Sequence, residues 1–540
     1  MKKILSLCTF LASAFILMAQ VSHGGHPLFR SNIQQVEFAP IVPSKHLQED
    51  IDEMPGASPL RMGITRSVSL SSNQIFSSPL LDTVNGQVVA TLRLASPGAT
   101  FQSFCFSQFQ LPEGAQMFFY DEQRHTVIGA FTKASIQPNG TFFTQAIPGE
   151  VCYMEYRYPI DSSAGTFQLA YVVQGYKDMY GDNFGAKAHI GYAQGDCHID
   201  VACPDGDDWR DQIRSVVEIY TVTTNGGYLC SGALINNTAN DKTPYVLSAY
   251  HCQELPSPLV GQVFYFNYQA SACGADDAPI NQTVAGCEYM ALDGQSDFWL
   301  VRLNEQVPDA YQPYYAGWSR EVIDRPALGC GIHHPGGDIK KISFPYRVQL
   351  SPTHRRFYRV DWISTRGVVE QGSSGSPLFN GNKLIIGQLW AAFGSVSCED
   401  ESGYSMYGRI ASSWIGNGDP GSCLAPWLDP LYTDAMTCSG LDYTATAPTP
   451  DGVSGQGDYS DKGLFLYPNP SNGIVKLSLP TLGEASYTVR DLHGNTILQG
   501  STIVSTVTHA INLSSLPSGA YVLELILDDQ VYRNTFIIRK

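Results

Sequence analysis

The stretch Gly372-Ser-Ser-Gly-Ser-Pro377 is a serine loop flanked by glycines. Such a loop presents the Ser374 hydroxyl beside the backbone N–H groups of Gly372 and Ser374. A nucleophile next to an anion-binding pocket is what acyl transfer requires. Serine and glycine also fill ordinary turns, so the loop by itself does not establish a catalytic site.

Two further stretches offer partners for this serine. The apolar run that begins at Tyr245 ends on His251, where a base at a strand end would lie. Asp297 opens the next apolar run, as a buried acid at a strand start would. Histidine, aspartate and serine follow each other in the chain order of the chymotrypsin-type triad. We therefore predict that His251, Asp297 and Ser374 are catalytic; a core histidine, a turn aspartate and a loop hydroxyl are the alternatives.

Composition predicts several β-rich globular domains. The chain has 540 residues, of which 43% are hydrophobic and 15% charged, with 50 glycines and 32 prolines. This balance suits turn-rich β-structure better than helical bundles. The formal net charge is −17 and no basic stripe is present, so we do not expect nucleic acid as a partner.

The first 24 residues resemble a secretory signal peptide. Met1-Lys-Lys precedes a short apolar run, Ile4 to Met18, and small residues follow it. A membrane anchor is the alternative, but the run is too short to span a bilayer comfortably. Since no other stretch is long and apolar enough, we expect no transmembrane segment in the mature protein.

The cysteine count predicts disulfides. Thirteen cysteines less Cys8, which lies in the predicted signal peptide, leave an even number in a chain that looks exported. Metal-type Cys-x-x-Cys pairs are absent from the sequence, and we expect neither a metal nor a cofactor. A Cys230–Cys252 bridge would pin the strand that ends on His251. Cys105 and Cys152 are expected to pair in the first region, with two free thiols as the alternative.

We divide the chain into five parts. Residues 1–24 are the signal peptide, and 25–190 form a β-sandwich-like region with alternating apolar runs. Residues 191–442 carry all of the predicted chemistry. A linker rich in Thr, Ala, Pro, Gly, Ser and Asp covers 443–462, and 463–540 read as a small β-sandwich with Asn-Pro, Asn-Gly and Ser-Gly turns.

The residues around the predicted triad resemble the lysyl endopeptidases, which are secreted bacterial serine proteases of the chymotrypsin-like superfamily. The motifs that carry the resemblance are Gly195-Asp-Cys-His-Ile-Asp-Val-Ala-Cys203-Pro, Leu234-Ile-Asn-Asn-Thr-Ala-Asn-Asp241, Ala316-Gly-Trp, Ile332-His-His-Pro335 and Trp427-Leu-Asp-Pro430. It covers most of residues 191–432. The resemblance implies an all-β, chymotrypsin-like double β-barrel with the site in the cleft between the barrels.

In this family pattern His251 is the general base, Asp297 orients it and Ser374 attacks the carbonyl. The amides of Gly372 and Ser374 bind the oxyanion, and the substrates are proteins or peptides.

The resemblance also implies disulfide pairings. These are Cys197–Cys398, Cys203–Cys273 and Cys230–Cys252. We pair the four remaining cysteines as Cys287–Cys330 and Cys423–Cys438.

The pair His333 and His334 suggests a metal site at first sight. We favour a structural role because the family that shares this His-His-Pro run is metal-independent and Pro335 breaks any helix that would align ligands.

Activation is expected to differ from that of trypsin. Ser373 stands where trypsin-like zymogens carry the aspartate that pairs with a newly freed N-terminus. Activation by that ion pair is therefore not available. We expect instead that residues up to the late 180s form an inhibitory or folding-assisting prodomain that is removed after export. Lys187 is a candidate cleavage point, and an ordinary exposed loop lysine is the alternative.

The resemblance predicts lysine at P1 but lacks its usual counter-charge. The family carries an acid two positions before Tyr407-Gly-Arg, where this chain has Ser405. Asp400, in the acidic loop after Cys398, is a candidate replacement, and Trp390 stands where the family has a histidine beside the substrate cleft. A buried lysine side chain without a partner would cost several kcal/mol, so arginine or an uncharged P1 residue remain alternatives.

The last block resembles the C-terminal sorting domain of the type IX secretion system of Bacteroidota. The motifs are Leu466-Tyr-Pro-Asn-Pro-Ser-Asn-Gly473, Val489-Arg-Asp-Leu-His-Gly494 and Leu516-Pro-Ser-Gly-Ala-Tyr521. The resemblance implies handling by that machinery and a secreted protein that is extracellular or attached to the cell surface. We thus predict a secreted serine endopeptidase. An adhesive or carbohydrate-binding β-sandwich, and a catalytically silent surface adhesin overall, are the alternatives.

Overall fold

The computed structural model of the protein describes residues 24–445 except 53–57, 138, 180–195, 254–259, 276, 401, 417 and 432, and residues 465–538 except 468–470, 472, 479–482, 492–493, 505–507 and 528–529. All but the last residue of the predicted signal peptide, the candidate cleavage point Lys187 and most of the predicted linker lie outside the described residues.

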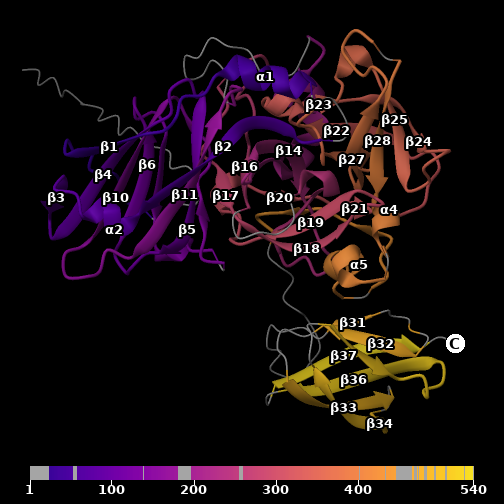
Figure 1. The fold of residues 1–540 in the computed structure, drawn as a ribbon. Helices are drawn as coiled ribbons and strands as arrows, with labels where there is room; N and C mark the ends of the chain where they lie inside the picture. The colour runs from indigo at the N-terminus through magenta and orange to yellow at the C-terminus, as the bar shows by residue number, and fades with distance from the viewer. Residues whose placement is uncertain are drawn as a thin grey trace, which may run out of the picture.

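Two β-sheets pack against each other in the N-terminal region, which Figure 1 shows in indigo to purple. The first sheet has the order β1-β4-β10-β6-β7, with β3 paired to β4. Its strands are β1 (Ile33–Glu37), β3 (Leu81–Val84), β4 (Gln87–Ala95), β6 (Gln116–Asp121), β7 (Val127–Phe131) and β10 (Val151–Pro159). The second contains β2 (Leu60–Ser71), β5 (Phe101–Gln110), β8 (Phe142–Phe143), β9 (Ile147–Pro148) and β11 (Thr166–Gly175). Phe104, Phe106, Phe119 and Met154 are buried between the sheets, because alternate strand residues point to the same face.

The first β-barrel follows and is all antiparallel. It consists of β13 (Val216–Val222), β14 (Gly226–Leu234), β15 (Tyr245–Ala249), β16 (Gly261–Phe266), β17 (Thr283–Ala285), β18 (Cys287–Asp293) and β19 (Phe298–Leu303). The pairing runs β17-β16-β13-β14-β15-β19-β18. Every residue of β15 is buried, so this strand fixes the backbone that leads into His251.

The N-terminal region joins this barrel through a shared sheet. Strand β2 pairs antiparallel with β14, with Gly63 opposite Gly227 and Leu60 opposite Leu229. A single hydrophobic cluster contains residues of both regions, and the Tyr220 hydroxyl lies 2.9 Å from Ser103 Oγ across the junction. The contact is therefore a continuous β-sheet with a common apolar core.

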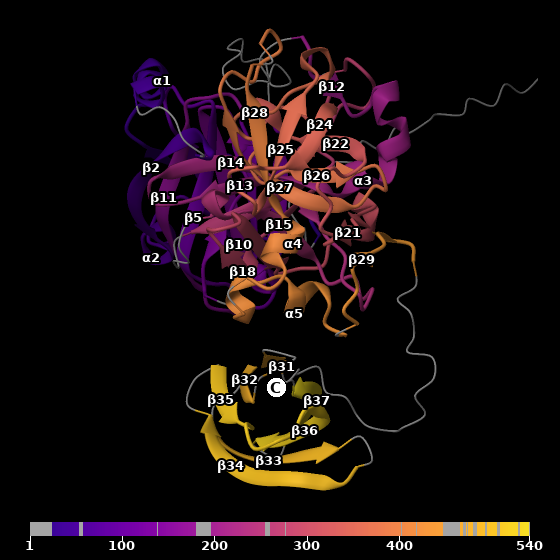
Figure 2. The same ribbon diagram turned by 90° about the vertical axis from the view of Figure 1, so that its right-hand side faces the viewer.

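The second barrel is built on one ten-stranded sheet with the order β12-β23-β22-β26-β27-β28-β25-β24. Its strands are β12 (Ile199–Asp200), β22 (Leu328–His333), β23 (Lys341–Ser343), β24 (Pro345–Leu350), β25 (Phe357–Trp362), β26 (Pro377–Asn380), β27 (Ile385–Phe393) and β28 (Tyr404–Arg409), with β21 (Trp318–Ser319) and β29 (Thr437–Cys438) at the side. Strand β15 of the first barrel lies beside β27 of the second (Figure 2). The chain thus has the chymotrypsin-like double β-barrel that the resemblance implied.

The C-terminal region, yellow in Figure 1, contains a three-stranded and a four-stranded sheet. The strands are β31 (Phe465–Tyr467), β32 (Ile474–Ser478), β33 (Gly483–Asp491), β34 (Thr496–Val504), β35 (Thr508–Asn512), β36 (Gly519–Leu527) and β37 (Gln530–Ile538). Elsewhere β20 (Tyr314–Tyr315) pairs with β30 (Leu441–Asp442), and the α-helices are α1 (Pro43–Asp52), α2 (Ser72–Phe76), α3 (Arg210–Ser215), α4 (Ile410–Ser413) and α5 (Ala425–Leu428). Within the described residues, none of the helices combines the length and the apolar character needed to cross a membrane.

Three disulfides are formed among the described residues, and they are the three that the resemblance implied: Cys197–Cys398, Cys203–Cys273 and Cys230–Cys252. The other three predicted pairings, Cys105–Cys152, Cys287–Cys330 and Cys423–Cys438, are wrong, because all six of these cysteines are free.

Location explains two of the wrong pairings. Cys105 lies on β5 and Cys152 on β10, which belong to different sheets. Cys287 opens β18 of the first barrel, whereas Cys330 lies in β22 of the second.

Cys423 and Cys438, the third wrong pair, have different neighbours. The Cys438 sulfur accepts a hydrogen bond from Asn236 at 3.6 Å, while Cys423 follows a short 3₁₀ helix. Burial raises the pKa of the Cys423 thiol to about 12.

Candidate active site

His251 and Asp297 are joined by two hydrogen bonds. The ring Nδ1 of His251 lies 2.9 Å from Asp297 Oδ2, and the His251 backbone N–H donates to Asp297 Oδ1 at 3.1 Å. His251 sits in the single 3₁₀ turn Tyr250–Cys252 that ends β15, and the Cys230–Cys252 disulfide holds the next residue to β14. Since the carboxylate can only accept, Nδ1 carries the proton and Nε2 has a free lone pair.

Asp297 is held in a left-handed backbone conformation, with φ of 56°. Its carbonyl oxygen accepts hydrogen bonds from the Tyr250 N–H at 3.1 Å and from Gln388 Nε2 at 3.1 Å. Gln388 lies on β27 and also donates to the Ser296 carbonyl at 2.9 Å, so a residue of the second barrel fixes the acid of the first. Burial raises the pKa of Asp297 above its ordinary value of 3.8, while the hydrogen bond from His251 opposes that rise.

The serine loop is pressed against the end of β15. The Ser374 carbonyl accepts from the Ser231 N–H at 2.8 Å, and Gly375 donates to the Leu389 carbonyl at 2.9 Å. Gly375 has φ of 81°, and a Cβ there would come within 2.1 Å of Ser248 Oγ and 2.8 Å of the Ala249 nitrogen. Only glycine fits this contact, which brings Ser374 next to the turn that carries His251.

The second ring nitrogen of His251 is without a hydrogen-bond partner among the described residues. Nε2 of His251 is buried and makes no hydrogen bond within the described part of the chain. Ser374 is itself buried, with 8% of its surface exposed. The serine hydroxyl is thus not hydrogen-bonded to the histidine in this structure, and such bonds commonly tighten only when substrate binds.

We call residues 368–374 the oxyanion loop. Hydrogen-bond donors from outside these residues orient the backbone of the loop. The Gly336 N–H donates to the Gln371 carbonyl at 2.7 Å, and the Ser376 N–H donates to the Ser373 carbonyl at 3.0 Å. In a trans peptide the N–H points away from the carbonyl, so the amides of Gly372 and Ser374 point away from these two donors.

The residues predicted to contact the P1 side chain do not supply a buried negative charge. Ser405 is fully buried, and its hydroxyl accepts a hydrogen bond from Trp362 Nε1 at 2.9 Å. Asp400 is exposed, and its carboxylate accepts from the Ser402 N–H at 2.8 Å. Trp390 lies on β27, with its ring 4.7 Å from that of Phe357.

His333 and His334 are both fully buried at the end of β22. His333 contacts two serine hydroxyls, and Nδ1 of His334 lies 2.9 Å from the Asp338 carbonyl oxygen. Burial lowers the pKa of His334 to about 3 and that of His333 well below its ordinary value. These contacts agree with a structural role for both.

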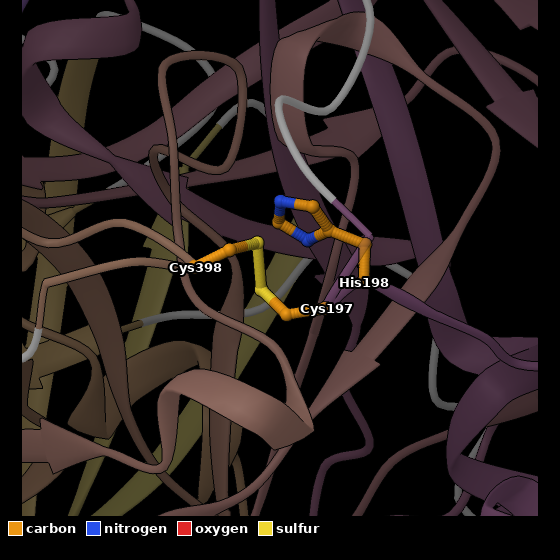
Figure 3. A group of neighbouring side chains, drawn as sticks. All are labelled: Cys197, His198 and Cys398. Carbon is orange, nitrogen blue, oxygen red and sulfur yellow. A yellow bond between two sulfur atoms is a disulfide. The ribbon is translucent and has the colours of Figure 1, made fainter.

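Cys197, His198 and Cys398 form the one group with metal-ligand geometry among the described residues. Figure 3 shows that the two sulfurs are bonded to each other beside the His198 ring. A disulfide offers no thiolate to a metal ion. The His198 ring instead pairs with Glu370 at 2.8 Å, so this group ties the segment after residue 195 to the oxyanion loop.

Sequence reasoning missed the residues that orient the site from behind. These residues are Ser231, Gln388 and Gly336. His333 was noticed in the sequence, but its contacts with two serine hydroxyls were not predicted. The only local signal was that Ser231 follows Cys230, next to the predicted bridge.

Two family models match the chain. Residues 192–408 match the model described as lysyl endopeptidase, C-terminal domain, and residues 465–539 match the secretion system C-terminal sorting domain. A curated lysyl endopeptidase from Pseudomonas aeruginosa is 28% identical over 344 residues, which is 59% of this chain and 71% of that protein.

Solved serine proteases are similar to part of the chain. The protease Anisep from Arthrobacter nicotinovorans is 16% identical, with a TM-score of 0.29, over 36% of this chain and 90% of that one. The thermostable serine protease AL20 from an extremophilic microorganism is 13% identical, with a TM-score of 0.28, over 37% and 92%.

The double barrel and the family match of residues 192–408 define a serine endopeptidase with the chymotrypsin-like fold. More particularly, residues 192–408 resemble the lysyl endopeptidase C-terminal domain, and residues 465–539 are a type IX secretion C-terminal sorting domain. The sorting domain indicates a secreted protein, extracellular or on the cell surface.

Proposed function

We propose that the protein cleaves peptide bonds with Ser374 as nucleophile, His251 as general base and Asp297 as the group that orients the histidine. The observation that carries this proposal is the His251 ring: Nδ1 is fixed by Asp297 while the buried Nε2 is unpartnered beside the serine loop. The sequence order of the three residues supports the same roles.

The proposed reaction is acyl transfer. The Ser374 proton moves to His251 Nε2 as Oγ bonds to the substrate carbonyl carbon, and the carbonyl oxygen becomes an oxyanion held by the amides of Gly372 and Ser374. The imidazolium then gives its proton to the leaving amine as the C–N bond breaks. Water, activated by the same histidine, hydrolyses the acyl-enzyme and restores Ser374.

Covalent labelling tests this proposal. A serine-reactive aryl phosphonate is expected to add once per chain of the processed protein, and mass spectrometry should place the adduct on Ser374. Absence of any adduct on correctly folded, processed protein would support the silent adhesin instead. N-terminal sequencing of the same sample locates the processing site.

We also propose that residues 25–190 act as a prodomain that assists folding of the first barrel. Strand β2 completes the pairing of β14, and the N-terminal region covers Val222, Leu229 and Val263, which are fully buried. Burial of apolar side chains stabilises the folded state by about 25 cal/mol per Å² of apolar surface removed from water. The barrel therefore gains much of its apolar packing on this side from the N-terminal region.

For the P1 residue, the Ser405 environment favours an uncharged side chain over the lysine that the resemblance predicts. Three described acids of the second barrel are bound to other groups or exposed. Asp361 is bound by Arg347 and Arg359, Glu370 pairs with His198, and Asp400 is exposed. A lysine side chain buried beside Ser405 would receive no counter-charge from these three acids as they are placed.

Ser405→Asp tests this view of specificity. We expect wild-type protein to cut a peptide library mainly after uncharged residues, and Ser405→Asp to raise kcat/KM for lysine at P1 by about 10-fold or more, since a buried ion pair replaces an unpaired charge. The matched control Ser402→Ala should leave the P1 profile unchanged. Strong lysine preference in wild-type protein would contradict the expected profile and would mean that an exposed acid such as Asp400 moves into the pocket.

A further inference from the structure

His333 occupies a closed position behind the oxyanion loop, with a serine hydroxyl on each ring nitrogen. Nδ1 lies 2.8 Å from Ser373 Oγ and Nε2 lies 2.8 Å from Ser343 Oγ. All three residues are fully buried. Ser373 immediately precedes the proposed nucleophile, so His333 contacts the oxyanion loop one residue before Ser374.

The hydrogen bonds continue from both serines back to the same loop. The Glu370 N–H donates to Ser373 Oγ at 3.2 Å, and Ser343 Oγ donates to the Val368 carbonyl at 3.3 Å. Burial keeps the imidazole neutral, so it has one donor and one acceptor. The network therefore begins and ends on backbone groups of the oxyanion loop.

Only one assignment of protons satisfies all of these contacts. Ser343 uses its hydroxyl proton on Val368, so it must accept from His333 Nε2–H. Nδ1 is then the acceptor and takes the Ser373 hydroxyl proton, while Ser373 Oγ accepts from Glu370. Every donor is used once. A side chain with no acceptor at the position of Nδ1 would leave the buried Ser373 hydroxyl proton without an acceptor, which is costly.

The residues that follow His333 hold the next peptides of the loop. The Gly336 N–H donates to the Gln371 carbonyl, and Ser231 Oγ donates to the Gly372 carbonyl at 2.9 Å while accepting from the His334 N–H at 3.0 Å. Gly372 has φ of 89°, and a Cβ there would lie 2.9 Å from the Gly337 nitrogen. The end of β22 and the turn that follows it thus contact the oxyanion loop from Val368 to Gly372.

We propose that His333 is a positioning residue that holds the oxyanion loop in its working shape, in the place where trypsin-like zymogens use an ion pair with a freed N-terminus. The four hydrogen bonds of this network join His333, Ser343, Val368, Glu370 and Ser373, all of which lie within the protease region. The oxyanion loop therefore has supports inside that region, and we expect its shape to need no ion pair with a freed N-terminus. This inference rests on the proposed function of Ser374.

The test compares His333→Leu, which has no hydrogen-bonding group, with His333→Gln, which offers one donor and one acceptor of similar reach. The mature enzyme is titrated with the aryl phosphonate, so that kcat refers to working sites only, and it is assayed with the best library substrate and a peptidyl aldehyde inhibitor. We expect His333→Leu to lower kcat per site by about 100-fold, with KM within about 3-fold, because a misaligned oxyanion donor costs transition-state stabilisation. Aldehyde affinity should fall in parallel, and His333→Gln should recover at least about a tenth of wild-type kcat.

Two further variants keep the test decisive. Ser373→Ala removes the hydroxyl that links His333 to the oxyanion loop, and it should lower kcat by about 10-fold or more even if His333→Leu does not fold. Thr353→Ala, on an exposed loop, is the control and should match wild type. Unchanged kcat per titrated site in Ser373→Ala and in folded His333→Leu, or equal losses in His333→Leu and His333→Gln, would overturn the inference. Failure of the proposed function is distinguishable, because wild-type protein would then not titrate at all.

Discussion

Replacing Ser374 with alanine is expected to lower kcat by about 10⁶-fold and to abolish phosphonate labelling, because the acyl-enzyme can no longer form. The Ser374 backbone would still be held by the Ser231 N–H and the Gly375 contact with Leu389. KM and thermal stability should therefore change little. The measurement is kcat and KM with the best substrate from the peptide library.

The same experiment includes His251→Ala and the double variant. If the two residues work as one unit, each single replacement costs about as much as both together, since the base has no function without its nucleophile. Ser376→Ala is the matched control in the same loop and should retain kcat within about 3-fold, because Ser376 has no step in the proposed reaction. Additive losses in the double variant would argue against a shared step.

Asp297→Asn is expected to lower kcat by about 10⁴-fold while KM and the fold are kept. In the native site both carboxylate oxygens accept, one from the His251 backbone N–H and one from ring Nδ1. An asparagine that still accepts from the backbone presents its NH₂ group to Nδ1. The histidine would then carry its proton on Nε2 and could not accept the proton of Ser374.

The control for Asp297→Asn is Asp293→Asn, a nearby buried acid that contacts Ser296 Oγ at 3.1 Å rather than the histidine. It should keep kcat within about 3-fold, although it can lower the melting temperature. Steady-state kinetics on phosphonate-titrated enzyme checks both variants. Wild-type kcat in Asp297→Asn would show that another group orients His251.

Several features could be predicted from the sequence because they depend on local chemistry or on spacing. The apolar run before His251 forms β15, whose residues are all buried. The serine loop requires Gly375 at a positive φ. Three disulfide pairings followed from the resemblance.

The remaining cysteines could not be paired from sequence, since bridging needs short Cα separations that only the fold defines. Cys105 and Cys152 illustrate this point. They lie in one predicted region and are both buried, but they belong to two different sheets.

The sequence by itself determined which residue types are available for the chemistry: a serine between glycines, a histidine at a strand end and an acid before an apolar run. Only the tertiary structure decided how their backbones are held. Gln388 of the second barrel binds the Asp297 carbonyl, and His333 spans two serines behind the oxyanion loop. These partners are distant in the chain and act through single hydrogen bonds. Such bonds depend on distance and direction in space, which no local pattern of residues encodes.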